Sequence, residues 1–226
     1  MTTFALIHGS GDGGWSWHLV QEALIERGHD SVAPDLPTDR TDATWEDCVV
    51  AVADAVGSTD DVVVVGHSSG GFVSPLVADR LRARMQVFLA GMVPQPGETG
   101  SDWFGNVGWS EAFAEQARSD GGLTGHEDPM IAFYHDVPPG LAAQAMARER
   151  PVGESLGESP WPLAALPSIP ARSIVTTRDR FIPASVQRRV AAERLAICEP
   201  DELVAGHCAN LAKPAELADI LASYVD

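Results

Sequence analysis

The pentapeptide Gly66–Gly70 (GHSSG) puts a serine directly after an apolar β-branched run, Val62–Val65, and just before an amphipathic segment, Phe72–Leu81. Consecutive valines are typical of a buried strand, and apolar residues at helical spacing predict a helix. Ser68 is therefore expected at a sharp strand-to-helix turn, where glycines on both sides let neighbouring main chain pass without Cβ clashes. A bare G-x-S-x-G pattern also occurs in ordinary turns, but the predicted strand before it and the predicted helix after it favour a nucleophile elbow here.

Two later loops contain the partners that an activated serine needs, an acid followed in the chain by a histidine. The run Ala171–Thr177 indicates a strand, and Asp179 follows it just before a predicted helix. Nearer the carboxyl terminus, Leu203–Gly206 leads directly into His207. Asp179 could instead pair with a neighbouring arginine or cap the next helix, and His207 could be a structural histidine. Order and spacing favour Ser68, His207 and Asp179 as nucleophile, base and orienting acid.

A glycine-rich loop, His8–Gly14 (HGSGDGG), follows the first predicted strand, Phe4–Ile7. Such a loop could cradle a phosphate, but it lacks the G-x-x-x-x-G-K-[ST] pattern, and Asp12 would repel a pyrophosphate. In a chain with a nucleophile elbow, we expect this loop to supply a backbone amide to an oxyanion. The predicted oxyanion hole consists of the backbone N–H groups of Ser10 and Ser69.

Strand and helix patterns alternate along the chain. The predicted strands lie near Phe4, Ser31, Val62, Gln86, Ala171 and Glu202. This alternation predicts an α/β fold, a mostly parallel sheet of about six to seven strands with helices on both faces. Between Gly91 and Pro170 the alternation stops. We therefore expect a single domain, 1–226, with a small helical cap at approximately 92–168, inserted after the strand at 86–90.

The expected cap is rich in aromatic side chains. Active sites in open α/β sheets lie at the carboxyl ends of the strands, so a cap there would contribute to the substrate pocket. Any single aromatic residue could instead be buried against the main body. The residues that we predict to line the pocket are Trp103, Phe104, Trp109, Phe133, Tyr134 and Trp161.

Three segments resemble one known family. With the elbow, the stretch Leu6–His18 (LIHGSGDGGWSWH) and the loop Gly206–Pro214 (GHCANLAKP) resemble the α/β-hydrolase superfamily, in the branch of plant methylesterases, hydroxynitrile lyases and bacterial esterases. The segment Tyr134–Pro139 (YHDVPP) resembles one that recurs in the bacterial members. The resemblance covers essentially the whole chain. It implies an α/β-hydrolase fold and a serine hydrolase that cleaves carboxylic esters of small apolar or aromatic substrates through an acyl-enzyme.

Two positions bear on the alternatives within this branch. Hydroxynitrile lyases typically have a threonine after the first-strand histidine and a lysine after the catalytic histidine, whereas this chain has Gly9 and Cys208. The resemblance therefore favours an esterase. It leaves open a hydroxynitrile lyase-like or cofactor-free enzyme of secondary metabolism, and a ligand-binding protein on a hydrolase scaffold. It does not separate an esterase from a thioesterase or a lactonase.

Composition restricts the expected partners. The formal net charge of −17 disfavours nucleic acid and anionic membranes, because both would be repelled. No long apolar segment stands at the amino terminus, so we expect neither a signal peptide nor a membrane span. The three cysteines lack metal-ligand spacing and indicate a reducing, cytoplasmic location. The expected partner is a small-molecule substrate, without cofactor or metal, and a homodimer is left open.

Overall fold

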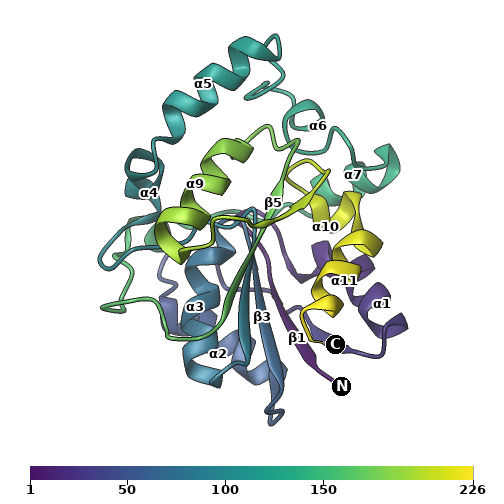
Figure 1. Cartoon of the computed structure of the whole chain (residues 1–226), viewed down its shortest axis with the longest axis vertical. Helices are drawn as coiled ribbons and strands as arrows, with labels where there is room; N and C mark the ends of the chain where they lie inside the picture. The colour runs from purple at the N-terminus through teal and green to yellow at the C-terminus, as the bar shows by residue number, and fades with distance from the viewer. Residues whose placement is uncertain (226) are drawn as a thin grey trace.

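The structure is a computed structural model that describes residues 1–225, and its centre is a six-stranded parallel sheet (Figure 1). The strands are β1 (Thr3–Ile7), β2 (Asp30–Val32), β3 (Val62–His67), β4 (Met85–Leu89), β5 (Ala171–Thr176) and β6 (Asp201–Leu203). Their order is β2-β1-β3-β4-β5-β6, and every neighbouring pair is parallel. The predicted fold class is confirmed. Parallel pairing brings the loops after β1, β3, β5 and β6 to one edge of the sheet.

Helices cover both faces of this sheet. One layer contains α2 (Trp45–Val56), α3 (Gly70–Leu81) and α9 (Ala184–Leu195), and the other contains α1 (His18–Glu26) and α11 (Pro214–Ser223) (Figure 1). Val62 and Val64 of β3 pack with the first layer, whereas Val63 and Val65 pack with the second. All four valines are fully buried. A continuous apolar run is what a central parallel strand needs, because both of its faces are covered.

The chain between β4 and β5 forms most of the remaining helices. These are α4 (Gly100–Asn106), α5 (Trp109–Ser119), α6 (Pro129–Ala132), α7 (Pro139–Met146) and α8 (Glu154–Glu158). In Figure 1, α5, α6 and α7 lie beyond the carboxyl ends of the strands, at the top of the view. These helices fall within the segment 92–168 that the sequence assigns to a cap. A buried ion pair, Arg194 Nη1 to Glu98 Oε2 at 2.5 Å, connects this segment to α9.

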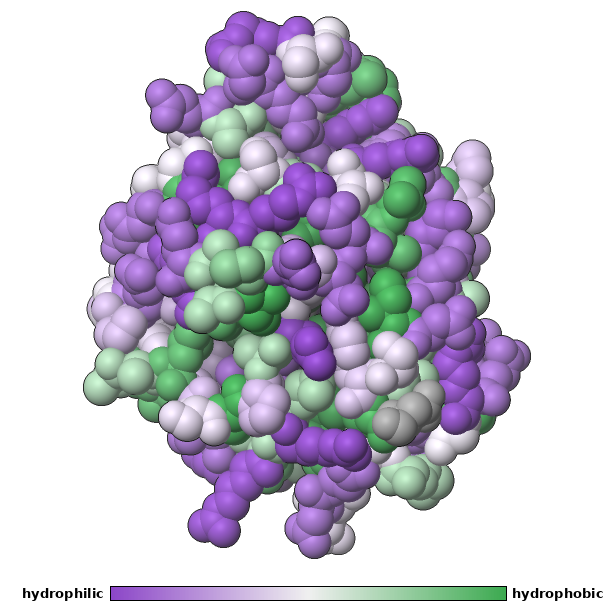
Figure 2. Space-filling model, in the orientation of Figure 1, coloured by the Kyte–Doolittle hydropathy of each residue, from purple (hydrophilic) through white to green (hydrophobic). Residues whose placement is uncertain are grey.

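The exposed surface is mostly polar. Figure 2 shows a predominantly hydrophilic face on which apolar side chains occupy small, separate areas. Ile25, Val152 and Val204 are more than half exposed, at 63%, 55% and 54%, and they come from different parts of the chain. Within residues 1–225, none of the helices combines the length and the apolar character that crossing a bilayer requires.

Candidate active site

Ser68 lies at the tip of the turn between β3 and α3. Its φ is 52°, in the left-handed region that residues other than glycine rarely adopt. Its backbone N–H donates to the carbonyl of Leu89 at 3.1 Å, and its own carbonyl accepts from the N–H of Met92 at 2.9 Å. Two hydrogen bonds to the segment at the end of β4 thus hold this strained residue in place, as a preorganised site requires.

The glycines on either side of Ser68 are required by close approach. A Cβ at Gly66 would lie 2.6 Å from Ser74 Oγ, and a Cβ at Gly70 would lie 2.7 Å from the carbonyl oxygen of His8. Both distances are far below van der Waals contact, and the second neighbour is backbone that cannot yield easily. The elbow therefore packs closely against α3 and the loop after β1, and a side chain at position 66 or 70 would push these elements apart.

His207 connects Ser68 to Asp179. Its Nε2 lies 3.0 Å from Ser68 Oγ, and its Nδ1 lies 2.7 Å from Asp179 Oδ2. With the proton on Nδ1, the ring donates to the carboxylate and accepts from the serine hydroxyl. All three side chains are buried. The structure thus brings together the three residues that the sequence selects, from loops that follow β3, β5 and β6.

Asp179 is held by four further donors. Its Oδ1 accepts the backbone N–H groups of Phe181 at 2.8 Å and Ile182 at 2.9 Å. Its Oδ2 accepts from Thr176 Oγ1 at 3.0 Å and from Gln187 Nε2 at 3.1 Å. Neither Thr176 nor Gln187 stands out in the sequence as part of the site. The signal that could have found them is their position: Thr176 is the last residue of β5, and Gln187 lies in the first turn of α9.

The charge state of this group of residues follows from burial and hydrogen bonding. Burial alone would raise the pKa of Asp179, but the positive charge that His207 can carry and the hydrogen bonds to the carboxylate outweigh it, so this pKa lies below its usual value. His67 donates from Nε2 to the carbonyl of His207 at 2.9 Å. Burial and the charge on His207 lower the pKa of His67 to about 3, so its ring is neutral. Asp179 is therefore the anion that can stabilise a protonated His207.

A cap residue holds the loop that carries His207. Asp136 Oδ2 accepts the backbone N–H of Gly206 at 2.6 Å, and a Cβ at Gly206 would lie 2.6 Å from Cε1 of His135. Gly206 directly precedes His207. The segment 134–139, which the sequence analysis links only to a resemblance, thus packs on the histidine loop.

Ser10 and Ser69, the two predicted oxyanion-hole residues, are in direct contact. The Ser10 backbone N–H donates to Ser69 Oγ at 2.7 Å, and the two hydroxyls lie 2.8 Å apart. His8 orients this loop, because its Nδ1 lies 2.8 Å from the carbonyl of Gly9 and its Nε2 accepts from the N–H of Leu36 at 2.9 Å. The Ser69 hydroxyl therefore accepts the hydrogen bond of the Ser10 backbone N–H, which we predict to bind an oxyanion.

A cavity of about 670 Å³ opens over Ser68 and His207. Of the predicted pocket residues, Phe104, Phe133 and Tyr134 line it. Apolar lining residues that the sequence analysis did not name include Leu36, Trp45, Phe72, Val73, Met92, Leu156 and Phe181. The rings of Phe181 and Phe133 lie 5.2 and 5.7 Å from the His207 ring. Position alone could have suggested Phe181, because it follows the acid by two residues.

The three tryptophans predicted for the pocket lie elsewhere. Trp103 and Trp161 are each 1% exposed, and their indole N–H groups donate to the carbonyls of Val93 at 3.1 Å and Phe72 at 2.9 Å. Trp109 donates to the carbonyl of Phe181 at 2.7 Å. A buried indole needs an acceptor for its N–H, and these backbone carbonyls supply it. Trp109 and Trp161 thus attach the cap segment to the body, and none of the three rings lines the cavity.

The cavity also contains polar side chains that the sequence analysis did not assign to it. Asp12, Glu149 and Cys208 line it. Burial raises the pKa of Asp12 to about 6, although the positive charge that His207 can carry acts in the opposite direction. Burial and nearby carboxylates raise the pKa of the Cys208 thiol, so the thiol is neutral. Among the described residues, no three His, Cys, Asp or Glu side chains come together as a metal site would require.

Comparison of the sequence with known families and curated proteins gives consistent matches. The profile described as "Alpha/beta hydrolase family" matches residues 4–220. Norfluorocurarine synthase 2 of a Strychnos species is 33% identical over 103 residues, 40% of this chain and 39% of the relative. The carbendazim hydrolyzing esterase of a Nocardioides species is 34% identical over 110 residues, 44% of this chain and 46% of the relative. Each of these two matches therefore spans less than half of the relative's length.

Comparison with solved structures extends the similarity to the whole chain. Polyneuridine aldehyde esterase superposes with a TM-score of 0.78 at 19% sequence identity, covering 100% of both chains. At this identity the likeness concerns the fold.

Proposed function

The chain belongs to the alpha/beta hydrolase family, and on this premise we propose that it is a serine hydrolase that cleaves carboxylic esters of small apolar or aromatic substrates. The observation that carries the proposal is the hydrogen-bonded series from Ser68 Oγ through His207 to Asp179, with distances of 3.0 and 2.7 Å. Nucleophile, base and orienting acid within hydrogen-bond reach are the geometric signature of nucleophilic acyl transfer.

In the proposed reaction, Ser68 Oγ attacks the ester carbonyl carbon and its proton passes to His207 Nε2. Asp179 accepts a hydrogen bond from His207 Nδ1–H and stabilises the resulting imidazolium. The tetrahedral intermediate collapses, the C–O bond to the alcohol breaks, and His207 returns the proton to the departing alkoxide. Water then repeats these steps on the acyl-enzyme, with His207 as its base, and releases the carboxylic acid and free Ser68.

The negative charge of each tetrahedral intermediate needs donors. We assign this role to the backbone N–H groups of Ser10 and Ser69, which come from the loop after β1 and the start of α3. A preorganised donor of this kind contributes roughly 3 kcal/mol to transition-state stabilisation. Before the Ser10 N–H can donate to an oxyanion, its hydrogen bond to the Ser69 hydroxyl has to break.

The proposed substrate class rests on the cavity. A volume of about 670 Å³ and a largely apolar, aromatic lining suit a small ester with an apolar acyl or alcohol group. The names of the carbendazim hydrolyzing esterase and of polyneuridine aldehyde esterase support ester cleavage as the reaction type.

The test combines turnover with active-site labelling. The purified chain is assayed on p-nitrophenyl acetate, butyrate and benzoate, with a thioester, a lactone and a cyanohydrin in parallel. Ser68→Ala and His207→Ala should each lower kcat on the best ester by about 10⁶-fold, because members of a triad act as a unit. Ser58→Ala, at an exposed serine, is the matched control and should retain wild-type kcat.

An alkyl fluorophosphonate should label Ser68 alone, as read by peptide mass spectrometry. Labelling without turnover of any ester, thioester or lactone would replace the hydrolase proposal with a binding or non-hydrolytic role. Cyanohydrin cleavage faster than ester cleavage would favour a lyase. Absence of label on Ser68 would contradict the assignment of the nucleophile.

A further inference from the structure

The cavity over Ser68 contains carboxylates without matching cations. Asp12 and Glu149 line it, and no lysine or arginine of the described chain does so. An anionic cavity wall repels anionic ligands and attracts cationic ones, most strongly where water is excluded. The charge of this pocket is therefore one-sided.

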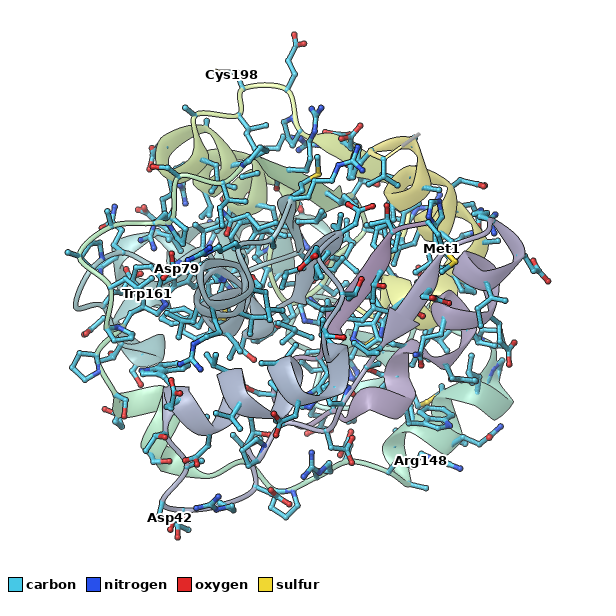
Figure 3. All side chains as sticks on the ribbon, turned by 90° about the horizontal axis from the view of Figure 1, so that it is seen from below. Met1, Asp42, Asp79, Arg148, Trp161 and Cys198 are labelled. Atoms are coloured by element: carbon cyan, nitrogen blue, oxygen red, sulfur yellow. The ribbon has the colours of Figure 1, made fainter. Side chains whose placement is uncertain are left out.

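The two arginines on either side of Glu149 in the sequence have other partners. The Arg148 guanidinium lies over the Trp15 ring, 4.5 Å from its centroid, and Figure 3 shows Arg148 at the outer edge of the molecule. Arg150 contacts Asp39 Oδ2 at 3.0 Å and donates to the carbonyl of Leu36 at 2.8 Å. Neither guanidinium lines the cavity or neutralises Asp12.

Within the part of the chain that the structure describes, the Asp12 carboxylate has no hydrogen-bond or ion-pair partner. Its backbone N–H donates to the carbonyl of Gly9 at 3.3 Å, but within residues 1–225 its side-chain oxygens accept no hydrogen bond. Burial raises its pKa to about 6, so at neutral pH the group is a partly buried anion that lines the cavity. A partly buried carboxylate that lacks a protein partner gains from a cation that a ligand brings.

Aromatic rings stand in the same cavity. Phe133, Tyr134 and Phe181 line it, and the ring centroids of Phe133 and Phe181 are 5.1 Å apart. The faces of aromatic rings attract organic cations, and a carboxylate beside several rings is the chemistry that recognises an alkylammonium group. Among the described residues, no third metal-ligating side chain joins Asp12 and Glu149 to complete a site for an inorganic cation.

Building on the proposed esterase function, we propose that the pocket takes esters whose acyl or alcohol group carries an alkylammonium centre, with Asp12 as its counter-ion and the cavity's aromatic rings as its walls. Asp12 is then a specificity-determining residue. Ser68, His207 and Asp179 perform the same chemistry on neutral and cationic esters, and Asp12 sets the preference between them.

The first test uses two esters of matched shape, acetylcholine and 3,3-dimethylbutyl acetate, which differ by a quaternary nitrogen in place of a carbon. The measured quantity is the ratio of their kcat/KM values at pH 8. We expect a ratio of about 10 in favour of acetylcholine for the wild-type protein. Asp12→Asn should bring the ratio close to 1.

Two matched variants separate Asp12 from general charge. Glu149→Gln removes the second carboxylate of the cavity, which is exposed and screened by solvent, so it should lower the ratio less than Asp12→Asn does. Asp60→Asn removes an exposed carboxylate just before β3, at the opposite edge of the sheet, and should leave the ratio unchanged. Equal effects of all three substitutions would overturn the assignment to Asp12.

The pH dependence of the ratio gives a readout that a merely structural role would not change. The groups that face Asp12 are His207, Glu149, Tyr134 and Cys208. Burial raises the pKa values of Tyr134 and Cys208, so both stay neutral below pH 8, and ionisation of the base His207 affects both esters and cancels in the ratio. We expect the wild-type ratio to rise as pH increases through about 6, and the Asp12→Asn ratio to stay flat. A flat wild-type profile would contradict the proposal.

A binding measurement keeps this inference separate from the esterase proposal. Phenyltrimethylammonium is titrated calorimetrically into wild type, Ser68→Ala and Asp12→Asn. Equal affinity for the first two and about tenfold weaker binding to Asp12→Asn support the cation site, even in a protein that cleaves no ester. Equal affinity for all three, or no binding to wild type, overturns it, even in an active esterase.

Discussion

Replacing Ser69 with alanine tests the oxyanion hole most directly. In the structure, Ser69 Oγ accepts the Ser10 backbone N–H at 2.7 Å and lies 2.8 Å from Ser10 Oγ. For the Ser10 amide to bind an oxyanion, the first of these hydrogen bonds has to break in every catalytic cycle. Ser69→Ala removes the hydroxyl and keeps the backbone N–H of residue 69, so the amide of Ser10 becomes free in advance.

The magnitude follows from the net value of one hydrogen bond. Such a bond contributes about 0.5–1.5 kcal/mol relative to water, so its removal should raise kcat/KM about 2- to 13-fold. If the Ser69 hydroxyl itself stabilised the oxyanion, the change in kcat would have the opposite sign and a larger size. Had the Ser69 hydroxyl been a donor to the oxyanion, its loss would cost about 10²–10³ in kcat. The two roles thus differ in sign as well as in magnitude.

The assay is steady-state hydrolysis of p-nitrophenyl butyrate at pH 8, with Tm measured for each variant. Ser10→Ala is the matched control, because it removes the neighbouring hydroxyl and leaves the contact between Ser69 Oγ and the residue-10 amide intact. It should change kcat/KM less than Ser69→Ala does. A tenfold or larger fall in kcat for Ser69→Ala at unchanged Tm would refute the reasoning.

Asp179→Asn should lower kcat by roughly 10⁴-fold with little change in KM, because the imidazole loses its orienting acceptor, and an unchanged kcat would remove Asp179 from the mechanism. Trp161→Ala should cost about 3–5 kcal/mol of unfolding free energy, measured by urea denaturation, because it empties a fully buried indole site where the cap segment packs on the body. The folded-state pKa of Asp12 is raised from 3.8 to about 6, so this carboxyl destabilises the fold increasingly as pH rises through that range. Asp12→Asn should therefore have a higher Tm than wild type at pH 8 and a much smaller advantage at pH 4, and a lower Tm at pH 8 would contradict the burial argument.

Much of the site could be predicted from local signals. The valine run of β3 and the glycines around Ser68 identify a buried strand and a sharp turn without any knowledge of the rest of the chain. Once the alternation of strands and helices indicates a parallel sheet, the loops after successive strands must meet at one edge. Asp179 and His207 could therefore be chosen by chain order alone, and their roles stay predictions that the Ser68, His207 and Asp179 variants will test.

The pocket could not be predicted in the same way. Trp103 and Trp161 are aromatic residues of the cap segment, like Phe133. Their indoles donate to backbone carbonyls and do not line the cavity, whereas Phe133 lines it and lies beside His207. Which ring faces which way depends on how short helices pack on a distant surface, and helical periodicity contains no information on that. Phe181 was missed because it belongs to the acid's loop and not to the cap.

The sequence by itself determined the sheet, the elbow and the order of the reactive residues, because these depend on periodicity and turn chemistry within a few neighbouring residues. Only the tertiary structure decided what those residues touch. The contact between Ser10 and Ser69 joins residues 59 apart, and the contact between Asp136 and Gly206 joins residues 70 apart. The raised pKa of Asp12 likewise depends on burial and on the charges of Glu149 and His207, which come from distant parts of the chain. Burial, hydrogen-bond partner and charge state are properties of such distant pairs, and they appear only when the chain is folded.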